Sequence, residues 1–209
     1  MKYLSYRLSA AMWSRVLLLW IILALGAFVV GGTAVGMGQF IQGNVRTELT
    51  AQQISFTAAD RLSDEESAIP GLIENAGQPL TTGNQAQIYA NMIALHSRTA
   101  AEQAGYPDAT YATLGGIQRE LRAAVTTATE ANDAAALEQA QTELTNVTNL
   151  RNTLLTASTL RGNLFSAYGW DNVATGVQAA GAFIVVLGVA FLVLFVYELR
   201  RGHLPLTEA

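Results

Sequence analysis

Histidine and carboxylate side chains are the groups in this chain most able to bind a metal or transfer protons. The chain has two histidines, His96 and His203. A non-haem iron site needs two histidines and a carboxylate, and a zinc site usually needs three or four ligands. The two histidines are separated by a predicted membrane span, described below. We therefore predict no metal and no cofactor. His96 is interpreted as a packed or surface residue hydrogen-bonded to a neighbour, with a partner contact or a pH-sensitive role as alternatives.

The other chemical signals also argue against catalysis. No Gly-x-Ser-x-Gly elbow occurs, so the serines have no nucleophile motif. The run Asp64-Glu65-Glu66 lacks the pattern of a calcium loop and is interpreted as a solvated turn. The chain has no cysteine, which excludes thiolate chemistry and disulfides. We predict that the protein is not an enzyme.

Small residues in the first apolar segment indicate helix packing. Gly32-x-x-x-Gly36 and Ala27-x-x-x-Gly31 are small-x-x-x-small motifs, which allow helix backbones to approach closely in lipid. Gly181 and Gly188 offer a flat face in the second apolar segment. The predicted partner-packing residues are Ala27, Gly31, Gly32, Gly36, Gly181 and Gly188. Packing between the two segments, packing on another protein and no role remain open.

Two long uncharged segments predict two transmembrane helices. The chain is 51% hydrophobic and only 13% charged, and no charged residue lies between Arg15 and Arg46 or between Asp171 and Glu198. Each gap exceeds the roughly 20 residues that cross a bilayer as a helix. We predict spans at 16–37 and 173–197. A cleaved signal peptide is the alternative for the first, but its apolar stretch is longer than the usual run of roughly 7 to 15 residues.

The basic residues predict the orientation. Lys2, Arg7 and Arg15 precede the first span, and Arg200 and Arg201 follow the second. The segment between the spans holds seven arginines against fourteen acidic residues, a net charge of −7. The positive-inside rule therefore predicts a plasma-membrane protein with cytoplasmic tails at 1–15 and 198–209 and an extracytoplasmic domain at 38–172. The acidic balance argues against nucleic acid as a partner.

Three residues near the second span are candidates for the interface between the plasma membrane and the extracytoplasmic side. Tyr168 and Trp170 carry the amphipathic rings that collect at interfaces. Arg161 is expected either to pair with a carboxylate or lipid headgroup or to snorkel along the surface.

The pattern between the spans predicts helices, so the fold class is an all-α membrane protein with an extracytoplasmic helical bundle. Apolar residues at three-four spacing predict helices at 84–104 and 111–130, and a long helix from 133 into the second span that could bend at Gly169. The first span is expected to continue as helix over 39–50. A short extended piece is expected at 53–57 and a loop at 58–82.

Two motifs resemble a family of small actinobacterial two-span membrane proteins, often labelled "aromatic ring-opening dioxygenase LigA-like". One is Gln85-Ala86-Gln87-Ile88-Tyr89-Ala90 leading to His96, followed by Thr110-Tyr111-Ala112. The other is Thr156-Ala157-Ser158-x-Leu160-Arg161-x-x-Leu164-Phe165. The order of spans and outer helices is also similar, and residues 115–150 look like an inserted helical hairpin. The dioxygenase label conflicts with the absence of metal ligands.

The resemblance implies a membrane-anchored outer domain and a role as accessory subunit of the actinobacterial respiratory cytochrome bc–oxidase supercomplex. Our sequence-based hypothesis is therefore a non-catalytic subunit of a membrane complex, with integral membrane subunits and lipids as partners. The alternative is an extracytoplasmic sensor or ligand-binding module that acts through a partner, because two spans around an outer helical bundle are also the plan of bacterial chemoreceptors.

Overall fold

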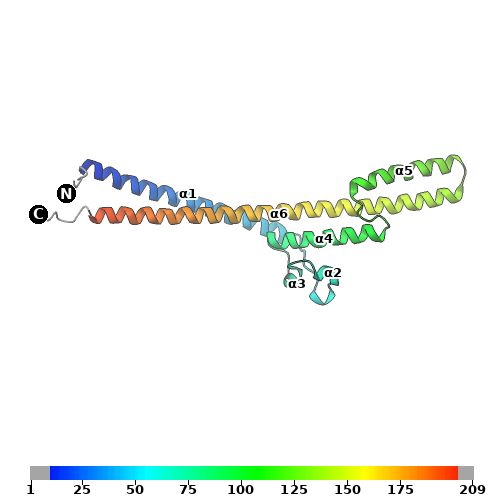
Figure 1. Cartoon of the computed structure of the whole chain (residues 1–209), viewed down its shortest axis with the longest axis horizontal. Helices are drawn as coiled ribbons and strands as arrows, with labels where there is room; N and C mark the ends of the chain where they lie inside the picture. The colour runs from blue at the N-terminus through cyan, green and yellow to red at the C-terminus, as the bar shows by residue number, and fades with distance from the viewer. Residues whose placement is uncertain (1–9, 202–209) are drawn as a thin grey trace, which may run out of the picture. The chain divides into compact units, whose positions relative to one another are not determined.

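The computed structural model describes residues 10–201, and every regular element longer than an isolated bridge in that range is helical (Figure 1). The chain divides into two compact units. The described residues of the first, 10–44 and 172–201, are called the paired-helix unit, and residues 45–171 are called the helical domain. Lys2, Arg7, His203 and the outer parts of the two predicted tails lie outside the described residues.

The two longest helices, α1 (Ala10–Ala51) and α6 (Ala134–Arg201), carry the apolar segments. Both are long and apolar enough to cross a bilayer, and only 11% of each apolar window is buried within the chain. A core helix of a soluble protein would have most of such a window buried. The all-α class is confirmed, and α6 passes Gly169 without interruption of its helical assignment.

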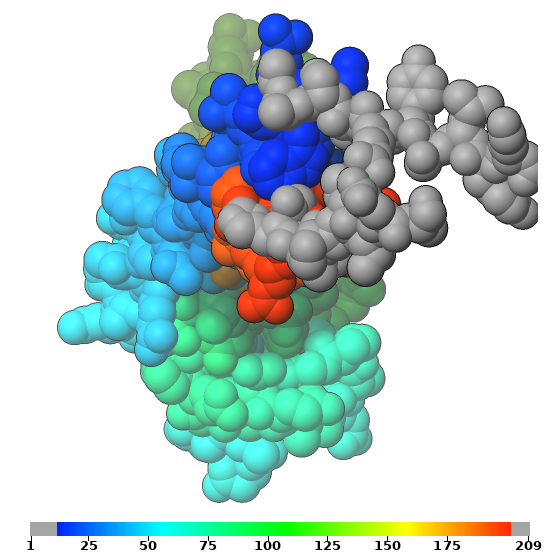
Figure 2. Space-filling model, turned by 90° about the vertical axis from the view of Figure 1, so that its left-hand side faces the viewer, coloured from blue at the N-terminus to red at the C-terminus, as the bar shows by residue number. Residues whose placement is uncertain are grey.

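In the paired-helix unit, α1 and α6 meet along a seam of small residues spaced by seven. The seam residues are Ala24, Gly31 and Gly38 on α1 and Ala174, Gly181 and Gly188 on α6, and all six are buried. A step of seven residues forward on α1 matches a step of seven backward on α6, so the helices are antiparallel. A seven-residue repeat is the pattern of left-handed helix pairs. Figure 2 shows the blue atoms of α1 beside the orange-red end of α6.

The glycines bring the two backbones into contact. A Cβ on Gly31 would lie 2.7 Å from the carbonyl oxygen of Gly181, and one on Gly38 would lie 2.7 Å from that of Ala174. A Cβ on Gly188 would lie 3.3 Å from the carbonyl oxygen of Ala24. A side chain at Gly31 or Gly38 would therefore separate the helices. The close approach provides the van der Waals packing that joins helices in lipid.

Larger side chains flank the seam. The rings of Trp20 and Phe191 stack with centroids 5.8 Å apart. The Gln42 amide donates to Thr175 Oγ1 at 3.1 Å, and the Gln178 amide donates to Gln42 Oε1 at 2.8 Å. These amides thus find partners on the facing helix, which removes the cost of leaving them unpaired in an apolar surrounding.

The helical domain contains α4 (Gly83–Gln103), α5 (Tyr111–Glu130) and part of α6. The predicted helices at 84–104 and 111–130 are confirmed within one residue. Side chains cap both at their first turns, because Thr82 accepts from the Gln85 amide and Thr110 accepts from the Thr113 amide.

The loop prediction at 58–82 is wrong in part, because three short helices interrupt the irregular segment. The segment forms η1 (Ala59–Arg61), α2 (Asp64–Ser67) and α3 (Leu72–Asn75). Each is too short to display a helical repeat of apolar residues, so periodicity could not detect them. The extended piece at 53–57 pairs only through an isolated bridge between Ser55 and Pro79.

Two apolar clusters hold the helical domain together in place of a single bundle core. The first joins the end of α1 and the short helices to α4 and α6, through Leu49, Phe56, Leu72, Leu80, Ala86, Ile88, Ala90, Met92 and Leu164. The second joins α4, α5 and α6 through Ala101, Leu114, Val147, Leu150 and Leu154. Helix α6 contributes to both, so it is the common support of the domain.

The first turn of α4 packs closely on α6. A Cβ on Gly83 would lie 2.8 Å from the Asp171 Oδ2 atom. Only glycine fits at this position without displacing Asp171. The close packing places the Asp171 carboxylate beside the N-terminus of α4, the positive end of the helix dipole.

A cysteine pair can test the antiparallel seam, because the chain has no natural cysteine. A Cβ on Gly188 would lie 3.2 Å from the Ala27 Cβ, close to the separation of about 3.5–4.5 Å in disulfides. We expect Ala27→Cys with Gly188→Cys to oxidise readily and to lose reaction with a maleimide mass tag. The control pair, Gly32→Cys with Gly188→Cys, should keep both free thiols. Equal oxidation of the two pairs would contradict the seam.

Candidate functional site

The predicted partner-packing residues fall into two groups. Gly31 and Gly181 face each other across the seam, and Gly188 packs on Ala27. Gly32 and Gly36 point elsewhere, and nothing lies within 4 Å of a Cβ built on either one. The structure therefore separates the two overlapping sequence motifs. Ala27 and Gly31 belong to the internal contact, whereas Gly32-x-x-x-Gly36 remains uncovered by the described residues.

Ala24, Gly38 and Ala174 also form the seam, but they were not among the residues predicted from the sequence. Their signal was the recurrence of small residues at seven-residue spacing, which runs through Ala24, Gly31 and Gly38. A search for four-residue spacing detects right-handed crossings and overlooks this repeat. The heptad pattern was therefore readable, but it was obscured by the more familiar motif beside it.

The three candidates for the outer interface lie in the last part of the helical domain, on α6. Trp170 is exposed, and Tyr168 is half-buried. The Arg161 Nε atom is buried without a hydrogen-bond partner among residues 10–201. Its guanidinium carbon lies 5.9 Å from the centroid of the Phe165 ring, a cation–π distance. Arg161 is thus held by its own helix while its charge has no carboxylate partner within the described chain.

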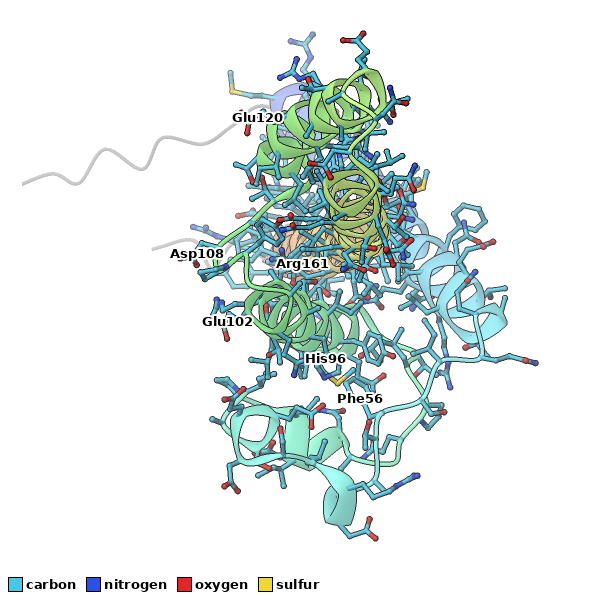
Figure 3. The ribbon with its side chains drawn as sticks, turned by 90° about the vertical axis from the view of Figure 1, so that its right-hand side faces the viewer. Phe56, His96, Glu102, Asp108, Glu120 and Arg161 are labelled. Atoms are coloured by element: carbon cyan, nitrogen blue, oxygen red, sulfur yellow. The ribbon has the colours of Figure 1, made fainter. Side chains whose placement is uncertain are left out.

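His96 forms a contact that links α4 to α2. Its Nε2 atom lies 2.7 Å from Glu66 Oε1, and the histidine side chain is 55% exposed whereas the glutamate is 13% exposed. Glu66 Oε2 also accepts the Ser63 backbone amide at 2.8 Å. One carboxylate therefore closes the capping box of α2 and binds His96. In Figure 3, His96 lies on the side of α4 that faces the lobe of short helices.

The surroundings of Glu66 favour its charged form. The Ser63 amide has the largest effect and lowers the pKa of Glu66 below its ordinary value of 4.5, and the hydrogen bond with His96 lowers it further. Partial burial opposes the shift by raising the pKa. The net direction is downward, so the folded domain stabilises the carboxylate over the acid.

A surface hollow of about 570 Å³ lies beside this pair. It is lined by Ser63, Asp64, Glu65, Glu66, Leu95, His96, Thr99, Ala100 and Gln103. Within residues 10–201, no three metal-ligating side chains converge here or elsewhere. The labelled carboxylates Glu102, Asp108 and Glu120 also lie apart in Figure 3. The hollow offers hydrogen-bonding groups and acidic charge, and its chemistry suits binding of a polar ligand.

A polar network joins α5 to α6 within the domain. Gln118 is buried and donates to Thr148 Oγ1 at 2.8 Å, while its oxygen accepts from Arg151 at 3.0 Å. Arg151 also donates to the Tyr111 carbonyl at 3.1 Å and lies 4.0 Å from the centroid of the Tyr111 ring. Both ends of the buried Gln118 amide therefore have partners, and the network ties α5 to α6.

Comparison with known proteins assigns the chain to no family. No family model, no curated protein and no solved structure matches the chain. The family resemblance noted in the sequence therefore stays a prediction.

The way in which the stability of the folded protein changes at acidic pH should depend on Glu66. Because its pKa is lowered on folding, Glu66 stabilises the native state above the unfolded pKa, and this contribution disappears as the pH falls through the folded value. We expect Glu66→Gln to lower the thermal midpoint at pH 6 by about 1–3 °C, and we expect this difference from the wild type to shrink as the pH falls. Circular dichroism melting from pH 3 to 7 measures this.

The matched control is Glu65→Gln, an exposed carboxylate on the same short helix. Its melting curve should follow the wild type at each pH. A constant offset between Glu66→Gln and the wild type at all pH values would show that the carboxylate charge plays no part.

Proposed function

We propose that α1 and α6 cross the plasma membrane with both chain ends in the cytoplasm and the helical domain outside. The support is the charge distribution, because Arg15, Arg200 and Arg201 flank the apolar segments on the side of the termini. The intervening segment carries a net charge of −7, and Trp170 lies exposed near its end.

Cysteine labelling in intact cells tests this topology. A membrane-impermeant maleimide should label Glu130→Cys, which is exposed at the end of α5, and should leave Thr207→Cys unlabelled until the cells are lysed. Labelling of Thr207→Cys alone in intact cells would reverse the proposed orientation.

The protein is proposed to act as a non-catalytic accessory subunit of a larger membrane complex. The observation that carries this proposal is the uncovered Gly32-x-x-x-Gly36 face. The contact between α1 and α6 uses a different set of small residues, and a Cβ on Gly32 or Gly36 would meet nothing within 4 Å. Such a face permits close approach of a further helix in lipid, where packing drives association. The partner in this proposal is an integral membrane subunit.

The respiratory cytochrome bc–oxidase supercomplex is the proposed partner complex. This assignment rests on the resemblance carried by the residues around His96 and by the Thr156–Phe165 motif. Both motifs lie in the helical domain, and each includes a side chain directed to a specific contact. His96 binds Glu66, and the Arg161 guanidinium lies at cation–π distance from the Phe165 ring.

A sensor or ligand-binding module is the second candidate, and the hollow beside His96 favours it. Glu66, His96 and Gln103 are among the polar groups that line the cavity of about 570 Å³, a volume within the range of small-molecule sites. In this second proposal, the module would act through a partner protein.

Affinity purification in a mild detergent tests the subunit proposal. We expect the tagged wild-type chain to co-purify with haem-bearing membrane subunits, identified by absorbance and mass spectrometry. Gly32→Ile with Gly36→Ile should reduce recovery of those subunits by about tenfold, because two branched side chains would hold the partner helix away. The contact between α1 and α6 should still form in this variant, since both positions are open within the chain.

The matched control is Gly26→Ile, another open position on α1, on a different side of the helix. This variant should retain the partners. Purification of the wild type as a single small species would exclude the subunit proposal. If a polar ligand also raised the thermal midpoint of that species, the result would favour the sensor.

A further inference from the structure

Residues 58–70 cross the surface of the helical domain without a single buried residue. The segment contains η1 and α2. The core residues Phe56 and Leu72, which are 4% and 0% exposed, lie just outside its two ends. Leu62 and Ile69 are half-buried and pack against the first apolar cluster. The segment is therefore fixed firmly at both ends and held lightly between them, and it is called the strap.

One polar contact joins the strap to the long helices. Backbone amides within the strap bond to carbonyls three or four residues earlier, as the Ala68 amide does to the Asp64 carbonyl at 3.1 Å. Among residues 10–201, the 2.7 Å contact of Glu66 with His96 is the only hydrogen bond or ion pair from the strap to α1, α4 or α6. This pair is called the latch.

The hollow of about 570 Å³ lies between the strap and α4. Residues 63–66 of the strap form one wall, and α4 forms the other between Leu95 and Gln103. In Figures 1 and 3, α4 lies between α6 and the lobe that contains the strap. The α4 wall is fixed, because Ala101 packs with residues of α6 in the second apolar cluster. Movement of the strap alone would therefore open or close the hollow.

The α4 wall carries polar groups that the domain itself does not use. Thr99 and Gln103 line the hollow, and within the described part of the chain neither side chain forms a hydrogen bond. A molecule that entered beneath the strap would thus meet free donors and acceptors on a rigid helix.

The packing favours opening of the strap without unfolding of the domain. Segments with few buried apolar contacts open at a much lower free energy than the core. Lifting the strap breaks the latch and exposes more of Leu62 and Ile69, whereas Phe56 and Leu72 can stay in the core. We propose that the strap is a lid over the hollow and that the latch between Glu66 and His96 holds it closed.

Hydrogen exchange of the full chain in detergent, followed by mass spectrometry, tests the lid. His96→Ala removes the latch and leaves the Glu66 contact with the Ser63 amide, so the capping box of α2 survives. We expect amides of the strap to exchange about 3- to 10-fold faster in this variant, the effect of losing one hydrogen bond to a charged group. Amides of α3 and α4 should exchange as in the wild type.

The matched control is Thr99→Ala, which removes another side chain from the same wall of the hollow without touching the latch. Its strap should exchange at the wild-type rate. His96→Gln keeps an N–H donor at this position and should restore part of the protection that His96→Ala loses.

Thiol accessibility provides a second measurement, because the chain has no natural cysteine. Thr99→Cys places a thiol in the hollow, and Arg98→Cys places one on an exposed position of the same helix. We expect His96→Ala to speed the reaction of a maleimide with Thr99→Cys and to leave the reaction of Arg98→Cys unchanged.

Two results would overturn the lid. Unchanged exchange of the strap in His96→Ala would show that the latch does not hold it. Equal acceleration of the strap and of α3 would show that the whole lobe unfolds together. Either result leaves the subunit proposal intact, because no residue of the strap belongs to the paired-helix unit.

Discussion

The contact between the backbones of α1 and α6 is the constraint on which the paired-helix unit depends. Ala24, Gly31 and Gly38 meet Gly188, Gly181 and Ala174, with backbone carbonyls where side chains would otherwise lie. In such a contact the helix backbones pack directly on each other, without large side chains interdigitating between them. Because the matching residues recur every seven positions, the contact fixes the antiparallel register and determines which faces of α1 remain outside.

The same register explains why one of two adjacent glycine motifs packs on α6 while the other remains open. Gly31 and Gly32 are neighbours in sequence but differ by about 100° around the helix, so a face that buries one leaves the other open. Gly36 shares the open side with Gly32. The distribution of small residues therefore gives α1 two packing faces, one satisfied within the chain and one available for another helix.

The sequence predicted the elements that have long periodic patterns and missed the features that depend on tertiary contacts. The helices of 20 residues or more were predicted because their apolar residues repeat over several turns, and α4 and α5 begin at recognisable capping residues. The short helices between Ala59 and Asn75 have no repeat to detect. The contact of His96 with Glu66 spans thirty positions and depends on how α2 folds back, which no local pattern encodes.

The candidate sites were also predictable only in part. Glycine spacing identified the regions where helices meet, but the division between the internal and the open face required the register of α1 against α6. Arg161 was expected to meet a carboxylate, a headgroup or water. Its buried Nε and its aromatic neighbour depend on side-chain packing that the sequence does not specify.

The two units use different packing because their surroundings differ in the proposed topology. In water, the helical domain buries Leu, Ile, Met and Phe in two clusters, and removal of apolar area from solvent drives the packing. In lipid that driving force is absent between helices, so the paired-helix unit relies on small residues and on amide pairs such as Gln42 with Gln178.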